Sequence, residues 1–201
     1  MKALVFRGDG KSGKTLLMER AVRELRRRGY RVGVVKHCPH LHPEGERNDS
    51  GRMLRAGAGG VLLLADQVDV LYRPACHPRP ETGPGTAGGD ERGEARGGHT
   101  VSGQDHTDAL RLHDALHGLD QEYVLVEGFK SYPGPLPSLV FVRTPERMRE
   151  LGAGHTVACS GPAELEEDAR SLGLVFFPLA ADGGSLADFI ERHAVPPPAG
   201  P

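Results

Sequence analysis

Short apolar runs alternate along the chain with stretches in which apolar residues recur every three to four positions. The runs have the length of strands buried on both faces, and the periodic stretches are typical of helices with one buried side. The alternation predicts an α/β fold with a mostly parallel sheet and helices on both faces. We expect strands at residues 3–6, 31–37, 60–65, 68–72, 123–127, 138–143, 156–160 and 174–179, and helices at 16–28, 52–57, 104–117, 145–151, 162–172 and 185–193.

The first strand, helix and second strand predict a βαβ unit, in which the two strands form a parallel pair. Gly29 stands where a glycine ends the first helix. The apolar runs at 60–65 and 68–72 are compatible with two adjacent strands or with a hairpin. The ligand-binding edge of such a sheet lies at the carboxyl ends of its parallel strands.

A phosphate-binding pattern lies between the first strand and the first helix. It fits G-x-x-x-x-G-K-[ST], whose backbone N–H groups surround a phosphate chain. Bare glycines let the phosphates approach, and the helix N-terminus favours the anion. The pattern comprises Gly8, Asp9, Gly10, Lys11, Ser12, Gly13, Lys14 and Thr15.

This loop predicts a nucleoside triphosphate site in a P-loop NTPase-like three-layer αβα sandwich. Lys14 is expected against the terminal phosphates, where it would act in catalysis, and the Thr15 hydroxyl is expected on a bound Mg²⁺.

Two acidic residues are candidates to complete the site. Glu127 ends the apolar run from Tyr123, which is the Walker B arrangement, and its carboxylate would accept from Mg²⁺-bound water or bind the metal. Asp49 follows the loop after the second strand, where it would orient the attacking water, ligate Mg²⁺ or cap the short helix. We assign both residues catalytic and metal-binding roles.

A group of histidines follows the second strand. His37, Cys38, His40 and His42 fall within six residues, and imidazole and thiolate are transition-metal ligands. Their spacing is not that of a zinc finger or ribbon. We therefore favour a polar loop near the phosphates, in which Lys36 and His37 donate to anions.

Residues 74–103 differ in composition from the rest. This segment contains eight glycines and four prolines, with Val101 as its one large aliphatic residue. We expect one nucleotide-binding domain at 1–195, interrupted by a disordered insertion at 74–103 and followed by a flexible tail at 196–201. A lid over the nucleotide is the alternative, with Arg79, Arg92 or Arg96 reaching the phosphates.

Charge and composition argue against several partners. The net charge is −2, and the arginines of the first helix are spaced to pair with Glu19 and Glu24, as in Arg20–Glu24, so no nucleic-acid surface is indicated. No apolar run approaches the roughly 20 residues of a membrane span, and three cysteines do not imply a disulfide framework. We expect a soluble cytoplasmic protein without a signal peptide.

Several motifs together resemble the molybdopterin-guanine dinucleotide biosynthesis protein B (MobB) family. The resemblance spans nearly the whole chain apart from 74–103 and the tail. It rests on the phosphate loop, Val35-Lys36-His37, Asn48-Asp49-Ser50 with Arg55-Ala56-Gly57-Ala58, Leu125-Val126-Glu127-Gly128-Phe129-Lys130 and Leu186-Ala187-Asp188-Phe189.

The resemblance implies a GTP-binding protein with weak Mg²⁺-dependent GTPase activity. Such proteins assist the guanylyltransferase that attaches GMP to molybdopterin, giving its guanine dinucleotide form, and the family tends to be dimeric. Lys36, His37, Asp49 and Lys130 match family motif positions near the nucleotide. The long insertion and Cys38-Pro39 depart from the family pattern and affect the partner-facing surface.

Two other functions remain compatible with the residues. The first is a P-loop small-molecule kinase that uses the insertion as its lid. The second is a metal-delivery GTPase that uses the histidines between His37 and His42. The guanine-reading N-K-x-D signature is absent, and the loop at Cys159-Ser160-Gly161 is the candidate position for a backbone reader of the base.

Overall fold

A computed structural model describes residues 1–38, 49–65, 68–74, 108–129 and 134–198, with residues 108–110 described for the backbone alone. Eight strands form one sheet in the order β4-β3-β2-β5-β1-β6-β7-β8. All neighbouring pairs are parallel except β3 and β4, which form an antiparallel hairpin. The strands are β1 (Lys2–Gly8), β2 (Val32–His37), β3 (Gly60–Leu64), β4 (Asp69–Tyr72), β5 (Tyr123–Glu127), β6 (Ser138–Phe141), β7 (Thr156–Gly161) and β8 (Val175–Pro178).

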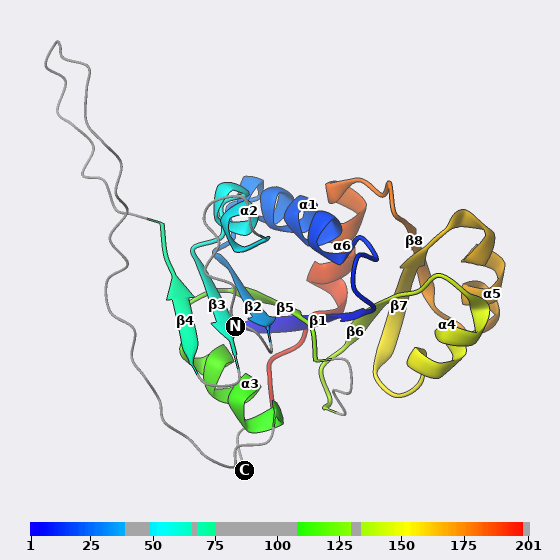
Figure 1. The fold of residues 1–201 in the computed structure, drawn as a ribbon. Coiled ribbons are helices and arrows are strands. Elements are labelled where there is room, and N and C mark those ends of the chain that lie inside the picture. The colour runs from blue at the N-terminus through cyan, green and yellow to red at the C-terminus, as the bar shows by residue number, and fades with distance from the viewer. Residues whose placement is uncertain (39–48, 66–67, 75–107, 130–133, 199–201) are drawn as a thin grey trace, which may run out of the picture.

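Helices cover both faces of the sheet (Figure 1). One face packs against α1, α2 and α6, whose apolar sides share a core with Leu4 and Phe6 of β1. The other face packs against α3 beneath the centre of the sheet and against α4 and α5 beneath β6 and β7. The helices are α1 (Lys14–Arg27), α2 (Asp49–Arg55), α3 (Asp108–His117), α4 (Pro145–Leu151), α5 (Glu166–Ser171) and α6 (Gly183–His193).

The strand order places β5 between the first two strands. β1 and β2 are parallel, but each pairs with β5 and not with the other, so the expected β1–β2 pair is wrong. In the register, Glu127 at the end of β5 lies opposite Phe6 on one side and Lys36 on the other. The inserted strand therefore carries the Walker B candidate between the phosphate loop and the end of β2.

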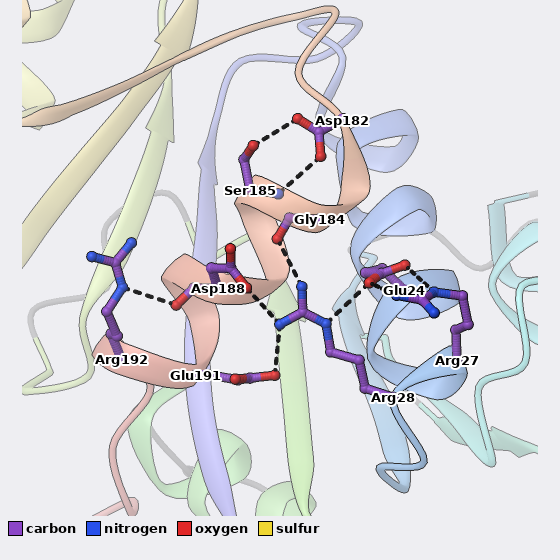
Figure 2. A network of polar contacts seen from close by, with 9 residues as sticks. All are labelled: Glu24, Arg27, Arg28, Asp182, Gly184, Ser185, Asp188, Glu191 and Arg192. Atoms are coloured by element: carbon purple, nitrogen blue, oxygen red, sulfur yellow. Dashed lines mark hydrogen bonds and ion pairs between the residues drawn. The ribbon is translucent and has the colours of Figure 1, made fainter.

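Helix α1 is joined to α6 by a network around Arg28 (Figure 2). The guanidinium of Arg28, which caps α1, donates to Glu24 of α1 at 3.0 Å. It also donates to Asp188 and Glu191 of α6 at 2.6 and 2.9 Å. Gly29 ends α1 with a φ of 93°, as expected for a helix-ending glycine. The network fixes α1, and with it the phosphate loop, against the C-terminal helix.

Two local expectations need correction. Arg20 does not pair with Glu24 but donates to the carbonyls of Leu179 and Ala181 at 3.1 and 2.9 Å. The expected 162–172 helix is a 3₁₀ turn, η1 (Ala163–Leu165), followed by α5. Residues 104–107 of the third expected helix lie outside the described residues.

Within the described residues, no helix is long and apolar enough to cross a membrane.

Candidate functional site

The Gly8–Thr15 loop leaves the carboxyl end of β1 and leads directly into α1. Three of its residues have positive φ, at 139° for Gly8, 57° for Lys11 and 97° for Gly13. A Cβ at position 8 would lie 2.5 Å from the carbonyl oxygen of Phe141 in β6, so only glycine fits there. Gly13 caps α1 without a side-chain bond, which leaves the first N–H groups of the helix available to an anion.

Lys14 folds back over this loop and is 7% exposed. Its ammonium donates to the carbonyls of Gly8 and Asp9 at 3.1 and 2.5 Å and to Ser12 Oγ at 3.2 Å. The loop thus holds a positive charge at the N-terminus of α1, where a terminal phosphate would be stabilised.

Thr15, Asp49, Glu127 and Lys36 converge beside the loop from α1, α2, β5 and β2. The Thr15 hydroxyl lies 3.2 Å from Asp49 Oδ2 and 3.4 Å from Glu127 Oε1. The Lys36 ammonium donates to Asp49 and lies 3.5 Å from Glu127 Oε2. Four positions that are far apart in the sequence therefore form one polar cluster, called here the carboxylate cluster.

The charges in this cluster hold each other ionised. Burial alone would raise the pKa of Asp49, but the hydrogen bonds from Lys36 and Thr15 keep it below its ordinary value. Burial alone would lower the pKa of Lys36, but Glu127 and Asp49 raise it above its ordinary value. Asp49 and Lys36 thus favour each other's charged forms.

The donor set fits Mg²⁺. Two carboxylates and a hydroxyl are hard oxygen ligands, and Mg²⁺ is usually held by one or two carboxylates together with nucleotide phosphates and water. Lys36 already places a cation between the two carboxylates. Among the described residues, no group of three His, Cys, Asp or Glu side chains is arranged to hold a metal ion, so phosphate and water would have to complete the coordination.

The glycine in Glu127-Gly128-Phe129, where β5 ends, is required for steric reasons. Gly128 has a φ of 105°, and a Cβ there would lie 2.9 Å from the Cβ of His37. The rings of His37 and Phe129 are stacked with their centroids 4.7 Å apart. His37 is therefore engaged in packing the ends of β2 and β5 together, next to the carboxylate cluster.

Two arginines contact the phosphate loop, although sequence reasoning assigned them no role. Arg143, just after β6, donates to the carbonyl of Lys11 at 2.7 Å. Arg147 in α4 contacts the Asp9 carboxylate at 3.2 Å and Glu150 at 2.6 Å. Only the strand order, with β6 next to β1, could have indicated that these arginines lie at the loop.

The region expected to read the base is arranged differently. Cys159, Ser160 and Gly161, expected as a loop whose backbone reads the base, are the last residues of strand β7, and Cys159 and Ser160 have no exposed surface. Leu179, after β8, comes close to the loop instead, since a Cβ at Gly13 would lie 3.1 Å from its Cδ2. Leu179 and Leu16 are 40% and 41% exposed.

Several candidate residues lie outside the described residues. They are Lys130, the metal-ligand candidates His40 and His42, and the lid arginines Arg79, Arg92 and Arg96. The expectations for 74–103, beyond Pro74, and for the last residues of the tail, 199–201, fall there as well.

Residues 3–81 match the family model described as molybdopterin guanine dinucleotide synthesis protein B, MobB. These residues include the phosphate loop, Lys36 and Asp49. Residues 3–81 are therefore similar to the MobB family.

A curated relative agrees with this assignment. The molybdopterin-guanine dinucleotide biosynthesis adapter protein of Haemophilus influenzae is 43% identical over 61 residues, which cover 30% of this chain and 34% of that protein. The match thus spans about a third of the relative. It supports the MobB resemblance for the N-terminal part of the chain.

Solved structures extend the likeness to the rest of the fold. Bacillus subtilis MobB has a TM-score of 0.55 at 21% identity, over 96% of this chain and 98% of that chain. Hydrogenase maturation factor HypB from Archaeoglobus fulgidus has a TM-score of 0.53 at 15% identity, over 96% and 89%. Together with the mostly parallel sheet, these likenesses confirm the P-loop NTPase-like fold predicted from the sequence.

Proposed function

We propose that this chain binds GTP with Mg²⁺ on the Gly8–Thr15 loop, hydrolyses it slowly, and assists a guanylyltransferase that converts molybdopterin to its guanine dinucleotide form. The observation that carries the proposal is the carboxylate cluster beside the loop, with Thr15 3.2 and 3.4 Å from the two carboxylates. The MobB match over residues 3–81 supports the pathway, because the relative from Haemophilus influenzae is named for that dinucleotide.

Each residue of the site has a distinct task in this proposal. The loop amides and Lys14 bind the phosphates, and Thr15, Glu127 and Asp49 would hold Mg²⁺ directly or through its water. Mg²⁺ held by these residues would neutralise negative charge on the phosphates. From the N-terminus of α2, Asp49 would also orient the attacking water. Lys36 lowers the pKa of Asp49 through its hydrogen bond and lies 3.5 Å from Glu127 before nucleotide arrives.

Slow hydrolysis follows from how the nearby arginines are used. Arg143 and Arg147 bind the loop carbonyl of Lys11 and the Asp9 carboxylate. An arginine on the transferred phosphate is worth roughly 10³–10⁵ in rate, and these two guanidinium groups are engaged elsewhere. The protein is therefore proposed as a nucleotide-dependent accessory protein.

The resemblance to the MobB family further suggests a homodimer acting in the cytoplasm. In this proposal, the exposed side chains of Leu16 and Leu179 offer an apolar surface for the base.

A reconstituted assay tests the accessory role. Formation of the guanine dinucleotide from molybdopterin and GTP is followed with the guanylyltransferase alone, with this protein added, and with its Lys14→Ala variant added. The wild-type protein is expected to increase product formation, and the variant is expected not to. Equal product in all three mixtures would contradict the accessory role, while leaving nucleotide binding to be judged by titration.

A further inference from the structure

A second polar feature lies on the sheet face opposite α1. Arg7 is the last residue of β1 before the phosphate loop, and by strand alternation it shares a face with Ala3 and Val5. Those two residues are fully buried in the core beneath α3, and Val140, the register partner of Arg7, belongs to the separate core beneath α4. Arg7 therefore stands between two apolar clusters, where a charged side chain is costly.

The guanidinium of Arg7 is buried but only partly used. The residue is 9% exposed, and Nη2 donates to the Leu151 carbonyl at the end of α4 and to Thr156 Oγ1, at 3.1 and 2.9 Å. Its Nε is buried without a hydrogen-bond partner among the described residues. The described residues provide no carboxylate within ion-pair distance of it, and burial lowers its pKa.

The need for a donor at the end of α4 explains one hydrogen bond of Nη2, but it does not explain why the side chain is charged. The Leu151 carbonyl is among the last of the helix and needs a donor, which Nη2 supplies. A neutral side chain could do the same without a buried charge. An arginine is the residue expected where an oxyanion is bound away from bulk water, because its guanidinium stays charged and carries several N–H donors.

A cavity of about 260 Å³ adjoins this guanidinium. Its lining includes Arg7, Leu136, Ser138, Glu150 and His155. Ser138 is 2% exposed, and its hydroxyl lies 3.3 Å from Thr156 Oγ1. Glu150, the carboxylate of the described lining, is held by Arg147 at 2.6 Å and does not neutralise Arg7.

We propose that this Arg7 cavity binds a small oxyanion, a phosphate monoester or a carboxylate, through the guanidinium of Arg7 and the hydroxyl of Ser138. The volume is below the usual range for a drug-sized ligand, so one such group with a small attachment fits. The site is separate from the phosphate loop, and its occupancy does not depend on the proposed GTP function.

The test uses full-length protein carrying Lys14→Ala, so that the phosphate loop does not dominate anion binding. Inorganic phosphate and acetate are titrated by calorimetry into this protein and into the same protein carrying Arg7→Gln as well. Binding of either anion, weakened at least about tenfold by Arg7→Gln, is the expected result. Phosphate binding alone would identify a phosphate monoester as the ligand, and acetate binding alone a carboxylate.

Two results would overturn the proposal. One is that neither anion binds the Lys14→Ala protein, and the other is that Arg7→Gln leaves the affinity unchanged. If Arg7→Gln does not fold, the Nε–H resonance of Arg7 is followed by NMR in the Lys14→Ala protein instead. Phosphate or acetate should shift that resonance, and a signal unmoved by both anions would equally overturn the site.

Discussion

Replacing Lys36 by methionine removes the ammonium that lies between Asp49 and Glu127. The side chains of Lys36 and Glu127 are 16% and 10% exposed, whereas that of Asp49 is 40% exposed. Removing one partner of a fully buried ion pair costs about 3–5 kcal/mol, and an exposed pair contributes about 0–1 kcal/mol. Because Asp49 is solvated and Glu127 is not, we expect the free energy of unfolding to fall by about 2 kcal/mol.

Thermal unfolding in EDTA measures this loss. For a chain of this size, about 2 kcal/mol corresponds to a Tm lowered by about 4–8 °C. The conservative Lys36→Arg should retain most of the stability, and Lys2→Met, at an exposed position, should change little. Mg²⁺ should then stabilise Lys36→Met more than wild type, because a bound cation replaces the missing charge.

The reasoning is refuted by either of two outcomes. A Tm of Lys36→Met in EDTA equal to that of wild type would show that the ammonium does not offset the charge of Glu127. An equal Mg²⁺ response in both proteins would show that the metal does not occupy the position between the carboxylates.

Further predictions concern acid stability, the loop glycine and the loop arginine. Hydrogen bonds from Arg27 and Arg28 lower the pKa of Glu24 from 4.5 to about 2, so its stabilising contribution is complete above pH 4.5 and is lost as the pH falls towards 2. The free energy of unfolding of Glu24→Gln should therefore depend less on pH in that window than that of wild type. An unchanged pH profile would contradict this. Gly8→Ala should lower the Tm markedly, because the added Cβ would lie 2.5 Å from the carbonyl oxygen of Phe141. Gly10→Ala should not lower it, because a Cβ there would have nothing within 4 Å. Equal Tm values for the two variants would count against the steric argument. Arg143→Ala should weaken GTP binding by about threefold to tenfold through loss of an exposed charged hydrogen bond to the loop, as measured by calorimetry, and unchanged affinity would remove its anchoring role.

The fold could be predicted from sequence to a large extent because its signals are local. The hydrophobic runs and the glycine pattern indicated strands, helices and the phosphate loop without knowledge of their neighbours. Strand order is not local, and so the insertion of β5 between β1 and β2 was missed. The same insertion explains why Lys36 and Glu127, both singled out from sequence, lie 3.5 Å apart.

Contacts made across the sheet account for what the sequence did not reveal. Arg143 and Arg147 reach the loop because β6 lies next to β1, and no spacing in the chain shows this. Leu179 approaches Gly13 because Arg20 binds the backbone of the segment after β8. Nothing in the sequence around Arg7 indicates that it is buried, because its burial between two apolar clusters depends on how the helices pack.

Calorimetric titration of GTP and ATP into the protein with Mg²⁺ tests the central claim most directly. The account predicts one GTP bound per chain with clear preference over ATP, loss of binding in Lys14→Ala, and loss of the Mg²⁺ dependence in Glu127→Gln. Equal binding of GTP by wild type and Lys14→Ala, or a clear preference for ATP, would contradict it.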